Sequence, residues 1–174
     1  MKANISPTNI ETVVKEDDFL VSKTDIKGRI TYANRNFLTI AGYSEAQVLG
    51  KQHNIVRHPD MPRGIFALLW ETLQNGCEFN GYVKNLRQDG GFYWVFANIS
   101  LNLSAQGVTK GFCSVRRKPK PEAVDSITAL YQAMLAEEKK VGPKRAITAS
   151  SAVLKNWLKG KTGGDDYATF VLTL

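Results

Sequence analysis

The sequence has few cysteines and few histidines, and this excludes several kinds of site. Cys77 and Cys113 stand far apart, without the spacing of a zinc site or of a disulfide framework. There is no glycine-rich phosphate loop and no Ser-His-Asp or Cys-His arrangement, so we expect a protein that is not an enzyme. Residues 1–18 lack the apolar core of a signal peptide, and unpaired thiols suit a reducing compartment. We therefore expect a cytoplasmic location.

The positive charge is concentrated near the end of the chain. The net charge is +7 over 174 residues, and residues 139–161 alone hold seven Lys or Arg and no acid. A basic stretch beside Trp157 and Leu158 is typical of a segment that lies next to a membrane. The sequence has no motif that reads bases, so we expect no nucleic-acid partner. The apolar residues 167–174 are too few to span a bilayer, so we expect the membrane anchor to follow this chain; a solvated tail is the alternative.

The order of the predicted elements indicates an α+β fold. Alternating and turn patterns predict strands at 19–24, 29–33, 79–86, 92–103 and 108–117. Between the second and third strands, capping signals at Asn34 and Ser44 predict two short helices, and Pro62 to Gly76 predicts a longer one. We expect a five-stranded antiparallel sheet with short helices on one face and a ligand crevice between them.

Helical periodicity returns after Pro121 and continues, with a break at Gly142-Pro143, to Leu158. We therefore divide the chain into an N-terminal cap segment (1–17), a sensory domain (18–118) and a helical linker with a basic tail (119–174).

Asn85 is the clearest polar residue on an apolar face. It continues the strand face of Phe79, Gly81 and Val83, which is expected to point into the crevice. A buried amide is costly unless it is paired, and a ligand edge would pair it. A position at the end of the strand, near the turn, is the alternative.

Several segments resemble PAS sensory domains. The run 25–34 (DIKGRITYAN) is similar to their opening hairpin, and 42–51 (GYSEAQVLGK) to their helical signature. The segment 53–62 (HNIVRHPDMP), with Trp70, 84–87 (KNLR) and 93–95 (YWV), resembles the PAS domains of Aer-type aerotaxis chemoreceptors. The resemblance covers residues 18–118.

This resemblance implies a cofactor and a site. Aer-type PAS domains hold FAD without a covalent bond, whereas related receptors hold haem. The resemblance implies cofactor-binding roles for seven residues: Asn34, His53, Arg57, His58, Asp60, Trp70 and Asn85.

Each of these residues also has an ordinary role that remains open. Asn34 is a good helix N-cap, and Asp60 is placed to cap the helix that begins near Met61. His53 could be a hydrogen-bonded structural residue, or it could be the axial ligand of a haem. Arg57 and His58 could pair with Asp60 within a structural turn, and Trp70 could simply pack in the core.

The resemblance also implies partners for the protein, and it leaves alternative functions open. We expect a redox sensor that signals to a HAMP module of the same receptor, forms a homodimer, and lies at the cytoplasmic face of the inner membrane. The alternatives are a haem-based gas sensor, a ligand-free dimerisation module, and the input domain of a kinase or cyclase.

Overall fold

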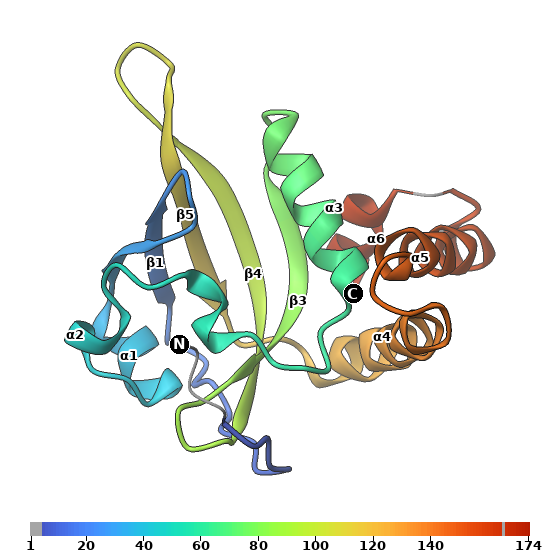
Figure 1. Cartoon of the computed structure of the whole chain (residues 1–174), viewed down its shortest axis with the longest axis horizontal. Coiled ribbons are helices and arrows are strands. Elements are labelled where there is room, and N and C mark those ends of the chain that lie inside the picture. The colour runs from blue at the N-terminus through green and yellow to red at the C-terminus, as the bar shows by residue number, and fades with distance from the viewer. Residues whose placement is uncertain (1–4, 165) are drawn as a thin grey trace.

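A computed structural model describes residues 5–164 and 166–174 (Figure 1). The five strands are β1 (Leu20–Asp25), β2 (Ile30–Ala33), β3 (Phe79–Leu86), β4 (Phe92–Leu103) and β5 (Thr109–Arg117). They form one antiparallel sheet in the order β2-β1-β5-β4-β3. The sequence-based prediction of an α+β fold is confirmed, and each strand lies within a residue or two of its predicted range.

Local side chains explain where the first elements begin and end. The Asp25 carboxylate accepts hydrogen bonds from the Lys27 and Arg29 amides, both 2.9 Å, and Gly28 takes a φ of +74° to close the β1–β2 turn. Asn34 Oδ1 accepts from the Phe37 amide at 3.0 Å, so it caps helix α1 (Arg35–Ala41) as predicted.

Three further helical segments follow α1 between β2 and β3. They are α2 (Glu45–Val48), η1 (His53–Val56) and α3 (Arg63–Gln74). Ser44 and Gln47 form the predicted capping box at α2. Pro62 lies one position before the helical residues of α3, and its missing amide leaves no donor unpaired there.

Side-chain alternation along β4 divides the protein into two cores. Tyr93, Val95 and Ala97 face helices α1 and α2 and form one core with Phe37 and Val48. Trp94 and Phe96 face the opposite side and belong to a second core. The sheet is therefore apolar on both faces at β4.

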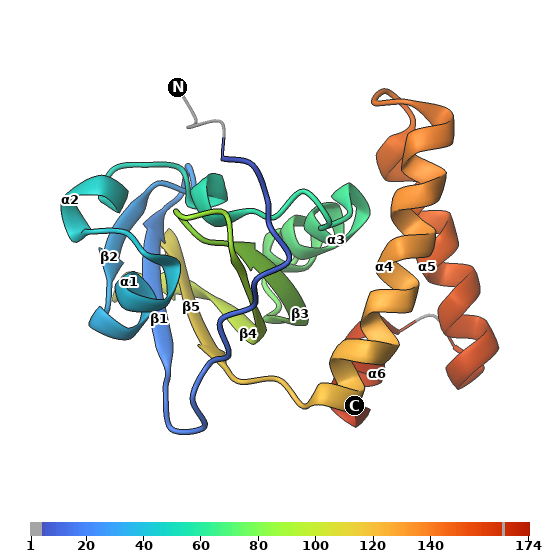
Figure 2. The ribbon, with the colours of Figure 1, turned by 90° about the horizontal axis from the view of Figure 1, so that it is seen from below.

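The C-terminal helices fill the second core. They are α4 (Pro121–Val141), α5 (Ala146–Thr162) and α6 (Tyr167–Thr173). Figure 2 shows α4 and α5 as an antiparallel pair beside α3. The Trp94 and Tyr131 rings stack 6.3 Å apart, and the Phe79 and Tyr167 rings lie 5.9 Å apart. Helices α4 and α6 thus cover the sheet face opposite α1 and α2 at β3 and β4.

The last apolar residues do not form the solvated tail that the sequence offered as an alternative. Tyr167, Phe170 and Val171 are buried in the second core, because a seven-residue helix places them on one side against β3. Asp166 caps this helix through the Ala168 amide. Among the described residues, none of the helices is both long and apolar enough to cross a membrane.

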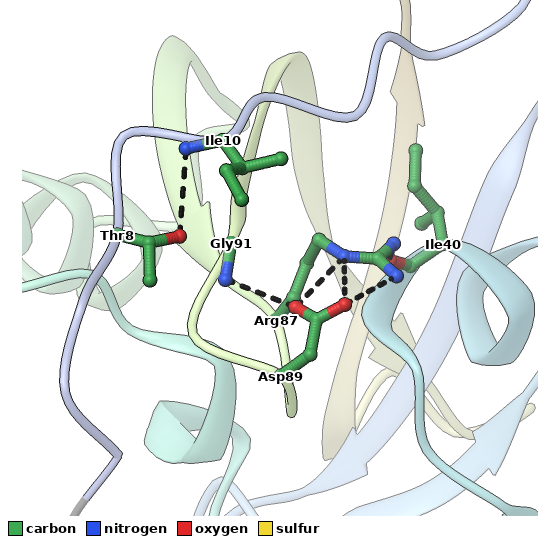
Figure 3. A network of polar contacts seen from close by, with 6 residues as sticks. All are labelled: Thr8, Ile10, Ile40, Arg87, Asp89 and Gly91. Atoms are coloured by element: carbon green, nitrogen blue, oxygen red, sulfur yellow. Dashed lines mark hydrogen bonds and ion pairs between the residues drawn. The ribbon is translucent and has the colours of Figure 1, made fainter.

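The N-terminal strap, residues 5–15, crosses the turn between β3 and β4. Its amides and carbonyls pair with that turn: the Thr8 amide donates to the Gly90 carbonyl at 2.8 Å, and the Phe92 amide to the Ile10 carbonyl at 2.9 Å. Below the strap, the Asp89 carboxylate accepts from the Gly91 amide and pairs with Arg87, which also donates to the Ile40 carbonyl (Figure 3). The strap thus holds the turn, and Arg87 ties the turn to α1.

Candidate functional site

A cavity of about 300 Å³ lies between one face of the sheet and the segment from η1 to α3. This face, which carries Val83, Asn85 and Ala97, is called the inner face below. This volume is at the lower end for ligand pockets, about 300–1,000 Å³. Its wall surface is mostly apolar, and its polar side chains come from β1, β3 and β5 and from residues 52–57. The lining residues are Ser22, Thr24, Gly28, Gln52, His53, Asn54, Val56, Arg57, Phe66, Leu69, Trp70, Leu73, Val83, Asn85, Ala97, Ile99, Phe112, Ser114 and Arg116.

Four of the seven predicted site residues line this cavity: His53, Arg57, Trp70 and Asn85. Asn34, His58 and Asp60 do not lie among its lining residues. The structure thus brings the first four together from η1, α3 and β3, and places the other three in supporting positions.

Asn85 is 4% exposed, and its Nδ2 atom has no hydrogen-bond partner within residues 5–164 and 166–174. It lies on the inner face of β3, opposite Tyr93 of β4. The backbone of Arg57 forms an isolated antiparallel bridge with Asn85, so the η1 segment adds to the free edge of β3 at this point. The result is a rigidly held amide with unused donor capacity facing an apolar cavity.

Arg57 and Trp70 lie on the helical side of the cavity. The Arg57 guanidinium donates to the Met61 carbonyl at 3.1 Å and lies 4.3 Å over the Phe66 ring. Burial is the main cause of a lowered pKa for Arg57. Trp70 is 41% exposed and meets Phe112 edge to face, with 5.2 Å between ring centroids. Phe66, Trp70 and Phe112 thus supply aromatic side chains to the cavity lining, with the Trp70 and Phe112 rings at 75° to each other.

His53 belongs to a polar cluster at one end of the cavity. Its Nε2 atom lies 2.8 Å from Arg116 Nη2 and 2.9 Å from Ser22 Oγ. Because a guanidinium can only donate, Nε2 must accept, and the ring proton is on Nδ1. Burial, and next the Arg116 charge, lower the pKa of His53 to about 3, so the ring is neutral at neutral pH.

His58 and Asp60 lie behind the Arg57 segment. His58 is 2% exposed, and its Nδ1 accepts from the Asp60 amide at 3.1 Å. Burial, then Lys84, lower the pKa of His58 to about 4, so its 3.5 Å approach to the Asp60 carboxylate is a contact of a neutral ring. Asp60 instead pairs with Lys84 of β3 at 2.7 Å. These contacts hold the η1–α3 connection against β3.

Asn34 supports the sheet as well as α1. Besides capping the helix, its Oδ1 accepts from the Val21 amide at 3.0 Å and its Nδ2 donates to the Phe19 carbonyl at 2.8 Å. All its hydrogen-bonding groups are engaged within the protein, and its role visible in the structure is to join β1 to α1.

Sequence reasoning missed the polar residues of β5. Ser114 and Arg116 are both buried in the cavity, and Ser114 Oγ and Arg116 Nη1 have no partner among the described residues. The signal was available in the alternation of β5, where Phe112, Ser114 and Arg116 share the inner face. A cation on the inner face of a central strand is unusual, and this alone could have identified Arg116 as a candidate site residue.

The fold and a family match define the class of protein. Residues 30–115 match the sequence profile described as the PAS fold. The light-state structure of the blue-light photoreceptor Aureochrome1 LOV superposes with a TM-score of 0.55 at 21% identity, covering 70% of this chain and 92% of that chain. A PAS domain from Colwellia psychrerythraea gives a TM-score of 0.54 at 22% identity, covering 58% of this chain and 86% of that chain. The chain contains a PAS domain.

Sequence similarity to longer proteins indicates which type of PAS domain the chain contains. The chain is 36% identical over 151 residues to the aerotaxis receptor of Escherichia coli (strain K12), covering 87% of this chain and 29% of the receptor. It is 33% identical over 106 residues to the nitrogen fixation regulatory protein of Klebsiella pneumoniae, covering 61% of this chain and 21% of that protein. The chain thus spans less than a third of these relatives. Its PAS domain is of the aerotaxis-receptor type, as the sequence motifs predicted.

Proposed function

We propose that this PAS domain binds FAD in the cavity and senses the redox state of the cell for a taxis receptor. The observation that carries the proposal is a set of three buried polar atoms, Asn85 Nδ2, Ser114 Oγ and Arg116 Nη1. They find no partner in the part of the chain that the structure describes, and all belong to residues that line one mostly apolar cavity. Buried donors are rarely left unpaired, and a ligand with acceptor atoms along one edge would satisfy them.

The lining residues fit a flavin ring. A flavin ring needs an apolar slot, and Val83, Ile99, Phe66, Trp70 and Phe112 supply apolar and aromatic lining for one. Asn85, Ser114 and Arg116 would hold the polar edge of the ring. Arg57 would bind phosphate, for which a guanidinium is well suited. When bound, FAD supplies the exchange of electrons that the protein side chains cannot perform.

The three predicted residues outside the cavity have supporting roles in this proposal. Asn34 fixes β1 to α1, and His58 and Asp60 brace the connection that carries Arg57. The haem alternative is less well supported, because His53 Nε2 is engaged by Arg116 and Ser22 rather than free to bind iron.

We extend the proposal to the rest of the chain. Residues 119–174 would connect the sensory domain (18–118) to signalling domains of the same receptor, such as a HAMP module, at the cytoplasmic face of the inner membrane, and the receptor would act as a homodimer. Because α4 and α6 cover the outer sheet face at β3 and β4, a change at Asn85 or β4 would reach these helices through Tyr82, Trp94 and Phe96. The protein would thus be a sensor and not an enzyme.

One absorption spectrum tests the cofactor. The purified chain, reconstituted with FAD and freed of excess, is expected to show the two-band profile of a bound flavin. A single intense haem band in the protein as purified would favour gas sensing. Protein that stays colourless after reconstitution would overturn the proposal.

The cysteines give a further expectation. Cys77 is exposed between α3 and β3, and Cys113 lies between Phe112 and Ser114 on β5, so its side chain points away from the cavity. Illumination is therefore expected to produce no lasting bleaching from a flavin–cysteine bond.

A further inference from the structure

Arg116 is a buried cation at the centre of the sheet. It is 4% exposed and lies on the inner face of β5, between β1 and β4. Its Nη2 atom donates to Ser22 Oγ at 3.1 Å and to His53 Nε2 at 2.8 Å, while Nη1 has no partner among the described residues. The guanidinium carbon also lies 5.4 Å from the centre of the Phe37 ring.

No carboxylate faces this charge within the part of the chain that the structure describes. The ion pairs there are made by other residues. Of the neighbours of Arg116, His53 is neutral at neutral pH, and burial raises the pKa of the Tyr93 hydroxyl further above neutrality. Burial lowers the pKa of Arg116 to about 10, which still leaves it charged.

An unbalanced buried charge destabilises a protein, because its loss of hydration is not repaid. A neutral donor could make the same hydrogen bonds to Ser22 and His53 at a lower cost. The charge itself therefore needs a reason, and the cavity that Nη1 adjoins offers one: a ligand can bring the missing negative charge.

We propose that Arg116 selects ligands by charge, making this cavity a site for a ligand edge that carries negative charge or acquires it. This inference rests on the proposed function. The ligand is then the flavin ring of FAD, and Arg116 binds the reduced ring more tightly than the oxidised ring. The oxidised ring is neutral; after uptake of two electrons and one proton it carries one negative charge. In the experiment below, dithionite supplies the electrons and the buffer supplies the proton.

The first measurement is the midpoint potential of bound FAD in the full chain. Arg116→Gln keeps hydrogen-bond donors and removes the charge, so the preference for the reduced form is expected to fall at least tenfold, which lowers the potential by about 30 mV for a two-electron couple. Arg116→Lys keeps the charge and is expected to retain most of the wild-type potential. Arg117→Gln is the matched control, because Arg117 is exposed on the opposite face of the same strand, 5.1 Å from the Phe96 ring centre. An unchanged potential in Arg116→Gln would overturn the inference.

The second measurement needs no flavin. In the ligand-free protein, Arg116→Met is expected to raise the urea midpoint of unfolding, because it removes an unbalanced charge. A lower midpoint in both Arg116→Met and Arg116→Lys would make Arg116 a structural residue and overturn the inference. If the wild-type protein binds no FAD, the proposed function fails, but the urea midpoint of Arg116→Met still tests the role of Arg116. A raised midpoint supports a cavity for another anionic ligand, and a lowered midpoint refutes it.

Discussion

At the scale of single residues, the site is built from polar groups that the folded protein leaves incompletely paired. Asn85 comes from β3, whereas Ser114 and Arg116 come from β5. Each is fixed by a strand, so the ligand-free protein keeps its donors in place at a cost in stability. Changes at these positions are expected to separate ligand affinity from stability.

Asn85→Ala is expected to weaken FAD binding about tenfold to a hundredfold, because one hydrogen bond to the ligand is lost. The free energy of unfolding of the ligand-free protein should hardly fall, since Nδ2 has no partner to lose among the residues that the structure describes. Titration of FAD followed by flavin fluorescence measures the affinity. Asn98→Ala is the control: Asn98 is on β4 but bonds Glu78 and Asn80 and does not line the cavity. Equal losses in both variants would contradict this role for Asn85.

His53 predicts an acid sensitivity of the ligand-free fold. Its pKa is about 3 when folded and about 6.5 when unfolded, so below pH 6.5 the unfolded chain binds a proton that the folded chain does not. Stability is therefore full above pH 6.5 and falls as the pH drops toward 3, by about 2 kcal/mol at pH 5 for this group. His58 acts in the same direction.

Urea unfolding at pH 7.5 and pH 5 measures this loss. A His53→Gln variant should lose less stability between these two pH values than the wild-type protein does. A loss of the same size in the variant would show that His53 is not the group responsible.

At the scale of elements, α3 links the cavity to the C-terminal helices. One side of α3 carries Phe66, Leu69 and Trp70, which line the cavity. Its first amides, those of Arg63 and Gly64, donate to the Glu138 carboxylate of α4 at 2.7 and 3.3 Å. A carboxylate at a helix N-terminus satisfies free amides and complements the helix dipole.

Glu138→Ala is expected to lower the free energy of unfolding by about 1–2 kcal/mol through loss of this cap. Chemical denaturation measures it. Glu137→Ala provides the comparison, because Glu137 makes only a surface pair with Lys140 and should cost less than about 0.5 kcal/mol. If the two variants were equally stable, α4 would not be holding α3 through this carboxylate.

The elements also show what could be predicted from sequence. Strands and capped helices followed from local patterns, such as the alternation of β4 and the Asn34 cap. Packing between distant segments did not follow: the burial of Tyr167 against Phe79 depends on the path of α4 and α5, which no local pattern specifies. For the site, Asn85 was found because it breaks an apolar face. Arg116 was missed: it stands next to Arg117, and two adjacent arginines at a strand end do not by themselves show which one is buried.

At the scale of the whole molecule, the C-terminal helices and the PAS domain share one core. Tyr82, Trp94 and Phe96 from the sheet pack with Ile127 and Tyr131 of α4, and the Tyr131 hydroxyl donates to the Tyr82 carbonyl at 2.8 Å. Since β3 is an edge strand, these helices also protect its free edge.

Removal of residues 119–174 is therefore expected to expose the aromatic side chains of β3 and β4. The truncated protein should bind a hydrophobic dye, show red-shifted tryptophan emission and associate at lower concentration than the full chain. Dye binding and light scattering measure these changes. A truncated protein that stays monomeric and binds no dye would show that this core is dispensable for the PAS domain.

The strand order determines when the cavity can form during synthesis. β5 lies between β1 and β4, so both neighbours are made before the strand that joins them. A nascent chain can complete its two outer hairpins while the middle of the sheet is still inside the ribosome. The buried cation of β5 thus arrives last, so the cavity can form only after translation has passed Arg117. A ligand of this cavity would then enter at the step that closes the sheet.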